Sequence, residues 1–195
     1  MKLKFYDEYI PGTKLKQSDM DGLTGLAFLK KVFFISEGVM MTQIREISGI
    51  DSSTLQNWTK RGWVANSKLK KYNIDQVAHI LIINMLRSCM QLEKIAFLIE
   101  YINGDLEDTS DDIIRDSELY DYICRILNRL IENGSCALTT IGETVAEITE
   151  NYREPFVGAR QRLNHALEVI VITYYATVIK QHANALLEKL EGEQI

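Results

Sequence analysis

The stretch TQIREISGIDSSTLQNWTKRGWVANSKLKKY, residues 42–72, decides the fold of the first half of the chain. It predicts a short helix capped by Thr42 and broken at Ser48-Gly49. A second helix is expected to begin after Asp51, whose short acceptor side chain suits the N-cap position. Two short helices joined by a tight turn form a helix-turn-helix.

The second of these helices has distinct inner and outer faces. Leu55 and Trp58 lie three residues apart and are expected to point into the core together. Gly62 is well placed to end the helix in a left-handed conformation. The outer face carries polar residues at i, i+3, i+4 and i+7, which are Ser53, Gln56, Asn57 and Lys60.

The loop after the second helix is rich in lysine. Residues 42–72 hold six basic and two acidic side chains, a local charge of +4 in a chain of formal net charge −5. Residues 105–195 hold 17 acidic and eight basic side chains, a local charge of −9. DNA repels such an acidic surface, so docking is expected only at the basic patch. A helix-turn-helix followed by a lysine-rich wing is a DNA-reading arrangement.

The residues predicted to contact double-stranded DNA lie on the two helices and in the wing. They are Thr42, Gln43, Ser52, Ser53, Gln56, Asn57, Lys60, Arg61, Lys68, Lys70 and Lys71. The lysines are expected to bind phosphate, and Gln56 and Asn57 are able to pair with adenine through two hydrogen bonds. Packing under the wing is favoured over stacking on DNA for Tyr72, and Trp58 is expected to be core.

The composition indicates a cytoplasmic globular protein. Of its 195 residues 46% are hydrophobic, enough for a core in one or two domains. The start, MKLKFYDEYI, lacks the apolar segment of a signal peptide. The longest apolar run is shorter than the roughly 18 residues of a membrane span. The three cysteines form no CxxC pair and are interpreted as reduced, small core residues: Cys89, Cys124 and Cys136.

Residues 1–104 are interpreted as an N-terminal arm followed by a winged helix-turn-helix domain. The arm, residues 1–21, is expected to be irregular, with a turn at Pro11-Gly12. Asn73 is expected to cap a helix that is apolar nearly all round and therefore central, and Gln91 another that stops at Gly104. Before the stretch 42–72, a helix is predicted over residues 23–35, with core candidates Leu23, Leu26, Ala27 and Val32 to Ile35.

Residues 105–195 are interpreted as a C-terminal helical domain, divided from the first by the acidic segment DLEDTSDD at 105–112. Helices are expected from this segment to Leu130, from about Ile141 to before Pro155, and over residues 156–190. The run EVIVITYYATVI in the last helix is rich in β-branched and aromatic residues and could form a strand. Its helical flanks and the lack of partner strands favour a helix.

The last helix is apolar on more than one face. Leu163, Leu167, Ile170 and Tyr174 have the 4-3-4 spacing of a helix–helix seam. This face is either the interface of a homodimer or part of an ordinary bundle within the subunit, and both interpretations stay open. A dimer would present two DNA-reading helices, one for each half of a palindromic site.

No pattern in the chain predicts catalysis, a metal site or a cofactor. There is no Gly-rich phosphate loop, GxSxG or HExxH motif. His79 is expected to be a surface or hydrogen-bonded residue rather than a ligand. Glu143, Glu147 and Glu150 share a helix face that is interpreted as solvated.

The runs TQIREISGIDSSTLQNWTKRGWV, KKYNIDQVAHILIINMLR and QLEKIAFLI together resemble the N-terminal domain of MerR-type winged-helix regulators. More closely, the chain resembles a family of Gram-positive bacterial proteins of unassigned function with a MerR-like helix-turn-helix. Elements shared with that family are Asn57-Trp58-Thr59-Lys60-Arg61-Gly62, Lys70-Lys71-Tyr72, Glu118-Leu119-Tyr120-Asp121-Tyr122 and Thr173-Tyr174-Tyr175.

The resemblance implies a mainly α-helical protein with a MerR-like winged helix-turn-helix and a helical C-terminal domain. The function expected is sequence-specific DNA binding as a transcriptional regulator and homodimer. The chain departs from MerR-type regulators where these carry an arginine and an aromatic pair, because Gln56, Asn57 and Trp58 occupy those places. The alternative is a protein–protein adaptor that uses the helix-turn-helix as a scaffold without binding DNA, and an enzyme has no positive feature.

Overall fold

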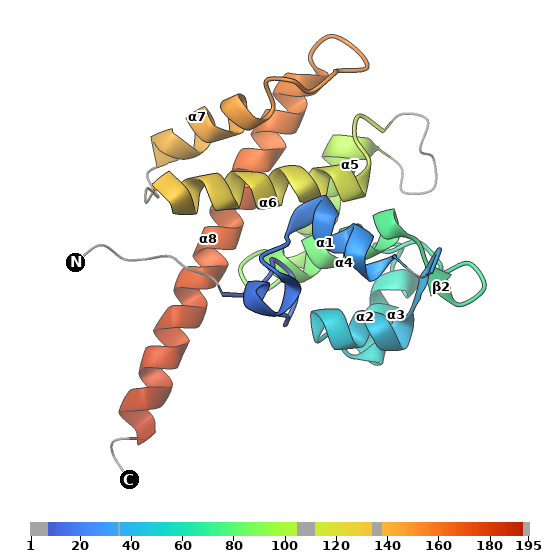
Figure 1. Cartoon of the computed structure of the whole chain (residues 1–195), viewed down its shortest axis with the longest axis vertical. Coiled ribbons are helices and arrows are strands. Elements are labelled where there is room, and N and C mark those ends of the chain that lie inside the picture. Colours follow the sequence, from blue (N-terminus) through green and yellow to red (C-terminus); the bar gives the residue numbers. More distant parts are fainter. Residues whose placement is uncertain (1–7, 35, 105–111, 134–137, 193–195) are drawn as a thin grey trace.

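The computed structural model is built almost entirely from helices (Figure 1). It describes residues 8–34, 36–104, 112–133 and 138–192. In chain order the elements are the 3₁₀ helix η1 (Gln17–Met20), α1 (Gly25–Val32), β1 (Val39–Met40), α2 (Met41–Ser48), α3 (Ser52–Lys60), β2 (Lys71–Tyr72), α4 (Ile74–Leu86), α5 (Leu92–Asn103), α6 (Asp116–Asn133), α7 (Leu138–Ile148) and α8 (Ala159–Gly192). The mainly helical fold class is therefore confirmed, and the run that could have been a strand lies inside α8.

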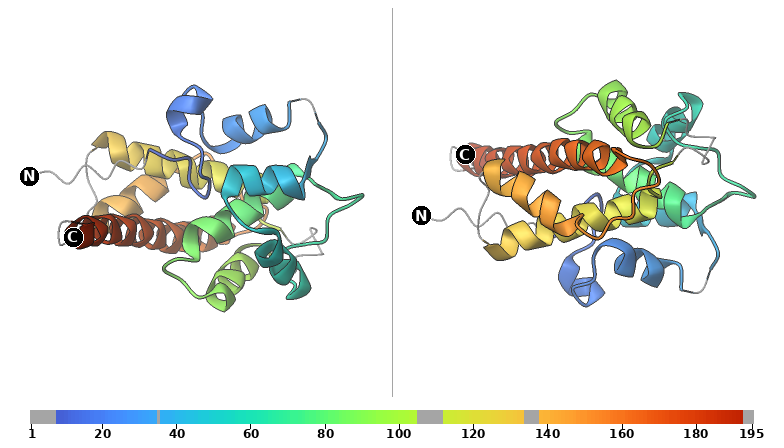
Figure 2. Two further views of the ribbon diagram at one scale, coloured as in Figure 1. Left: turned by 90° about the horizontal axis from the view of Figure 1, so that it is seen from below. Right: turned by 90° about the horizontal axis from the view of Figure 1, so that it is seen from above.

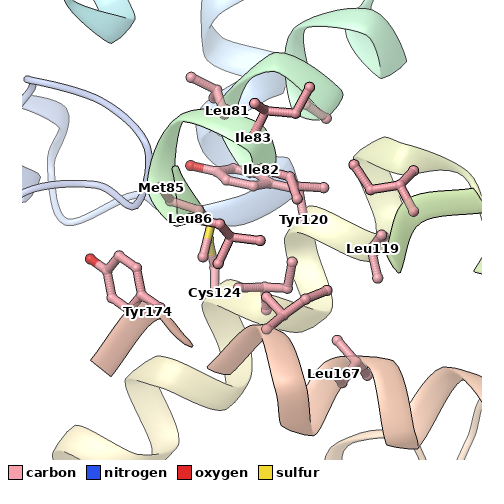
Figure 3. Close-up of a cluster of buried hydrophobic side chains, with 14 of the residues drawn as sticks. Leu81, Ile82, Ile83, Met85, Leu86, Leu119, Tyr120, Cys124, Leu167 and Tyr174 are labelled. Atoms are coloured by element: carbon pink, nitrogen blue, oxygen red, sulfur yellow. The ribbon is translucent and has the colours of Figure 1, made fainter. Parts of the chain in front are cut away.

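Helix α4 is the centre of the molecule, as its apolar sequence predicted. Asn73 Oδ1 accepts a hydrogen bond from the Gln76 amide at 2.8 Å, and the Gln76 side chain accepts one from the Asn73 amide at 3.0 Å. These two bonds fix the start of the helix. Helices α6 and α8 pack against α4, and buried side chains of all three helices form one cluster (Figure 3). The labelled core residues are Leu81, Ile82, Ile83, Met85 and Leu86 of α4, Leu119, Tyr120 and Cys124 of α6, and Leu167 and Tyr174 of α8.

Residues 8–21, the described part of the N-terminal arm, are packed against this core. Ile10 is fully buried, and the carbonyl of Pro11 accepts a hydrogen bond from the Tyr120 hydroxyl at 2.6 Å. Gly12 has φ +76° and lies against the backbone carbonyl of Leu81, where an added Cβ would collide. The turn at Pro11-Gly12 was expected, but the arm is held far more closely than an irregular segment suggests.

Helix α1 is shorter than expected, and the prediction of its core residues is confirmed only in part, because Leu23, Val32 and Phe33 pack partly buried against the core. Phe28 and Leu29 are fully buried, whereas Ala27 is exposed and Phe34 is 86% exposed. Ile35 lies outside the described residues. Ala27 lies on the exposed face of α1, and the prediction failed for Phe34 because the helix ends at Val32, so Phe34 no longer follows its buried face.

Among the cysteines, Cys124 is buried as predicted, and burial raises the pKa of its thiol to about 12. Cys89 is exposed, so its assignment to the core was wrong. It lies in the turn between α4 and α5, where the chain leaves the core. Cys136 lies outside the described residues.

In the second half, α6 begins at Asp116 and α7 ends at Ile148. Most of the acidic segment 105–112 lies outside the described residues, so the division into two domains stays a prediction. The buried side chains on either side of that segment belong to one cluster. Among the helices of the described residues, none combines the length and apolarity that crossing a bilayer requires.

The apolar face of α8 that was considered for a dimer packs inside the subunit. Leu163, Leu167 and Ile170 are fully buried, and Tyr174 is 6% exposed. Helices α4, α5, α6 and α7 cover this face. The interpretation of these four residues as an intersubunit seam was therefore wrong. They pack against helices of their own chain and are not available to a second subunit.

Candidate nucleic-acid interface

Helices α2 and α3 are joined by a tight turn at Gly49, Ile50 and Asp51. Gly49 has φ +75°, and its amide donates to the Arg45 carbonyl at 2.9 Å, which ends α2 as predicted. Ile50 is buried and anchors the turn. The two helices are thus fixed relative to each other by one glycine and one apolar residue.

The start of α2 differs from the prediction. Thr42 is not the cap, because the helix begins at Met41 and Met40 holds the N-cap position, two residues earlier than predicted. The side chain of Gln43 reaches back and accepts a hydrogen bond from the Met40 amide at 2.8 Å. Thr42 and Gln43 are both exposed on the first turn of α2. Strand β1 directly precedes this turn and was not foreseen.

Asp51 caps α3 as predicted. Its carboxylate accepts hydrogen bonds from the Ser53 hydroxyl and from the amide and hydroxyl of Thr54, at 2.7 and 2.8 Å for Thr54. These bonds, the one from Ser53 above all, hold the pKa of Asp51 well below its usual range. Ser53 is therefore exposed but committed to the cap, and Ser52 is half-buried.

The inner face of α3 is buried as expected. Leu55 is fully buried and Trp58 is 1% exposed. The Arg87 guanidinium from the end of α4 lies 5.6 Å from the Trp58 ring centroid, a cation–π contact. Gly62 has φ +74°, and the Trp63 amide bonds back to the Trp58 carbonyl at 3.0 Å, so the left-handed end of the helix is confirmed.

The outer face of α3 is exposed and polar over Gln56, Asn57 and Lys60. Asn57 Oδ1 accepts a hydrogen bond from Arg61 Nε at 3.2 Å. The Arg61 guanidinium lies 5.0 Å from the Trp63 ring centroid and 3.6 Å from the Glu93 carboxylate. Arg61 is therefore directed toward α5 by its own contacts, while the other three side chains face solvent.

The predicted wing is a tight hairpin over residues 68–71, which we call the lysine hairpin. Lys68 and Lys71 exchange backbone hydrogen bonds at 3.0 and 2.9 Å, and Leu69 and Lys70 between them both have positive φ, at 52° and 63°. Positive φ at both central residues is typical of a type I′ turn. Figure 2 shows the hairpin projecting from the side of the molecule opposite the end of α8.

All three lysines of the hairpin are exposed, and Leu69 at its tip is 96% exposed. Tyr72 is 3% exposed and packs beneath the hairpin, as expected. Strand β2 pairs with β1, with Val39 opposite Tyr72, which ties the hairpin to the chain that enters α2. Helix α3 and the lysine hairpin thus lie at the same end of the molecule (Figure 1).

A buried ion pair joins this end to the second half of the chain. His79 Nδ1 lies 2.8 Å from Asp116 Oδ2, and Nε2 lies 2.9 Å from the Trp63 carbonyl oxygen. Both partners accept hydrogen bonds, so both ring nitrogens donate and the imidazole is protonated. Burial alone would lower the pKa of His79, but the charge of Asp116 and the two hydrogen bonds raise it.

His79 is thus a hydrogen-bonded residue, as predicted. Among the described residues, no group of histidine, cysteine and carboxylate side chains is arranged to hold a metal ion. The three glutamates considered on α7 and just beyond it are exposed, as a solvated face requires, and Glu147 pairs with Arg129 at 2.7 Å. The sequence did not reveal that His79 pairs with Asp116, because the two residues are 37 positions apart in the chain.

Comparison with known proteins gives a family but no described activity. One curated relative, the "Uncharacterized protein YkrK" of Bacillus subtilis (strain 168), is 23% identical over 172 residues, which cover 84% of this chain and 74% of the relative. No solved structure matches the chain. The family model described as Domain of unknown function (DUF1836) matches residues 25–123, from α1 into α6 and just over half of the chain. The chain therefore belongs to the DUF1836 family.

Proposed function

We propose that this protein is a sequence-specific DNA-binding transcriptional regulator, with α2, α3 and the lysine hairpin forming a MerR-like winged helix-turn-helix. One observation carries the proposal. The outer face of α3 exposes Gln56, Asn57 and Lys60, and the lysine hairpin at the same end of the molecule exposes three lysines, in a chain of net charge −5. A basic patch around an anchored helix is the electrostatic footprint of a DNA-binding surface.

The exposed groups divide into two roles. Lys60 and the hairpin lysines contact phosphates and position the protein without reading sequence. Gln56 and Asn57 face base edges in the major groove, where an amide pairs with adenine N6 and N7. Asn57 keeps this capacity despite its bond from Arg61, because a carbonyl oxygen has two lone pairs and the NH₂ group has no partner among the described residues.

The rigid placement of α3 supports this role. Trp58 and Leu55 are buried, Asp51 caps the first turn, and Gly62 ends the last. A reading helix held at both ends keeps its polar face in a fixed orientation, which specificity requires. The same anchoring serves a protein-binding scaffold, so the DNA experiment below decides between the two.

The regulator acts as a homodimer through the exposed face of α8, not through the buried face that carries Leu163 and Ile170. Residues on this exposed seam repeat at alternating spacings of three and four: Val169, Ile172, Ala176, Ile179, Ala183, Leu186 and Leu190. All are exposed, with Ile179 at 50% and Leu190 at 58%. A heptad repeat of this length is typical of a coiled-coil partner.

The occupant we assign to the exposed seam is a second copy of this chain. Figure 1 shows the last turns of α8 extending beyond the other helices, and residues 179–192 are all exposed. An isolated helix with an apolar stripe gains stability chiefly from packing against a partner. A two-fold dimer also presents two reading helices, which a palindromic site requires.

The decisive experiment measures binding of the full chain to mixed-sequence duplex DNA at 50 and 200 mM salt. Binding that weakens steeply with salt, followed by enrichment of one palindromic motif from random duplexes, supports the proposal. A variant with Gln56→Ala and Asn57→Ala is the matched control and should lose the enrichment while keeping salt-dependent binding. Absence of binding at 50 mM salt would refute DNA recognition and favour the adaptor role.

A further inference from the structure

A cleft of about 540 Å³ lies where the N-terminal arm, α2, α4 and α8 meet. The residues that line it are Tyr9, Ile10, Gly12, Thr13, Lys14, Ser48, Asn84, Met85, Arg87, Ser88, Tyr174, Thr177 and Gln181. This volume falls within the range of small-molecule sites, roughly 300–1,000 Å³. None of the residues predicted to contact DNA lines the cleft, so it is a separate site.

The charged residues of the cleft are both cationic. Lys14 and Arg87 line it, and no carboxylate is found among its described lining residues. Neither cation forms a salt bridge within the part of the chain that the structure describes. In a chain with an excess of acidic side chains, two unpaired cations in a concave site create a local attraction for anions.

The neutral polar side chains of the cleft are largely occupied. Asn84 Nδ2 donates to the carbonyl oxygens of Gly12 and Ser48 at 2.8 and 3.0 Å. The Ser88 hydroxyl donates to Thr177 Oγ1 at 3.1 Å. These bonds fasten the walls to one another, and the charged donors that remain for a ligand are those of the two cations.

Helices α2 and α4 both end at the cleft, and helix C-termini carry partial negative charge. Two carbonyls near these ends are already bonded. Asn84 donates to that of Ser48, and Lys180 Nζ donates to that of Ser88 at 2.7 Å. Lys180 also adds a third positive charge near the rim, so these helix ends do not cancel the attraction for an anion.

The apolar part of the lining includes Tyr9, which is 43% exposed, and the nearly buried Met85 and Tyr174. We propose that the cleft binds a small organic anion, a carboxylate or phosphate monoester with an apolar body. Lys14 and Arg87 bind the charged group, and the apolar wall receives the rest of the molecule. This is the usual division of labour in ligand sites, where a few polar groups orient a largely apolar ligand.

Both cations also contact the α2–α3 pair. The Arg87 guanidinium stacks on Trp58 of α3, and the Lys14 amide donates to the Ile47 carbonyl of α2 at 2.9 Å. The Lys14 stem passes 3.8 Å from the position of a Cβ at Gly49 in the turn. A ligand on these cations therefore changes the surroundings of Trp58, and it would change DNA affinity if α3 reads DNA as proposed above.

The test uses the full chain without DNA, so that its outcome is independent of the proposed function. Benzoate and phenyl phosphate are the anionic probes, and benzamide is the neutral counterpart of benzoate. Calorimetric titration gives each Kd, and Trp58 fluorescence in a Trp63→Phe background reports on the cleft. We expect at least one anion to bind saturably below 10 mM and to change the fluorescence of Trp58, with benzamide inactive.

Lys14→Gln and Arg87→Gln should each weaken binding of that anion by about tenfold or more, since a hydrogen bond to a charged group is lost. Lys94→Gln, an exposed lysine of α5 outside the cleft, is the matched control and should leave Kd unchanged. The proposal is overturned if neither anion binds, if benzamide binds equally well, or if both cleft variants keep the wild-type Kd.

Discussion

Helices α3 and α8 pack on the same core, but α3 exposes a polar and basic surface and α8 an apolar one. Helix α3 buries Leu55 and Trp58 and presents polar and basic side chains. Helix α8 buries Leu163, Leu167 and Ile170 and presents an apolar heptad seam, in a half of the chain that is otherwise acidic. In both helices the inner face contributes to the core, while the outer faces differ in chemistry, which is why we propose different partners for them.

The largest expected effect comes from the inner face of α8. Ile170→Asp places a carboxylate where the wild-type side chain is fully buried, so the folded state should lose about 4 kcal/mol or more. Chemical denaturation followed by circular dichroism measures this loss. A variant as stable as the wild type would show that this face is not core.

The outer face of α8 should respond differently to the same change. Ile179→Asp leaves the subunit folded, since Ile179 is half-exposed, but it puts a charge into the proposed seam. Analytical ultracentrifugation should show monomers, and DNA affinity should fall by roughly 100-fold as the second reading head is lost. Asn184→Asp adds the same charge off the seam and should stay dimeric. Wild-type chains that sediment as monomers at micromolar concentration would contradict the dimer.

At the α3 end, replacing Lys68, Lys70 and Lys71 by alanine should weaken binding to all duplexes alike. Each phosphate contact contributes about 0.9 to the log–log slope of affinity against salt, so the slope should fall by about 2.7. Fluorescence anisotropy at several salt concentrations measures it. The control Lys94→Gln should keep the wild-type slope, and an unchanged slope in the triple variant would remove the hairpin from the interface.

A smaller effect is expected for Asn57→Ala on the outer face of α3. Loss of one amide contact should cost roughly 1–3 kcal/mol on the preferred site and relax preference at one base pair per half-site. Competition between the preferred duplex and single-base variants measures this preference. Equal weakening on every duplex would mean that Asn57 positions the protein rather than reading bases.

The smallest effect concerns His79 of α4 and Asp116 of α6, which join these two helices. Because folding raises the pKa of His79, its contribution is complete below the unfolded pKa of about 6.5 and is lost as pH rises through the folded value. The unfolding free energy should therefore fall by roughly 1 kcal/mol on the alkaline side, the worth of one hydrogen bond. Asp116→Asn should flatten this dependence in urea titrations carried from below the unfolded pKa of His79 into the alkaline range. A wild-type profile as flat as that of the variant would contradict the charged pair.

Local patterns along the chain were enough to predict α3 and its surroundings. The signals that define α3 act within a few residues: the cap Asp51, the terminating Gly62, and the spacing of Leu55 and Trp58. Their effect can therefore be predicted without knowing the rest of the fold. The same holds for the Asn73 cap of α4. Where the outcome depended on an element's length, as with Phe34 after α1, the prediction failed, because helix boundaries depend on packing against distant segments.

The sequence by itself determined a mainly helical protein with a polar, basic end and an apolar last helix, because periodicity and charge are local properties. Only the tertiary structure decided which of the two apolar faces of α8 is buried, since that depends on whether α4 and α6 cover it. The pairing of His79 with Asp116 and the cleft between the arm and α8 likewise required the fold. Both join residues far apart in the chain, and no local pattern records such contacts.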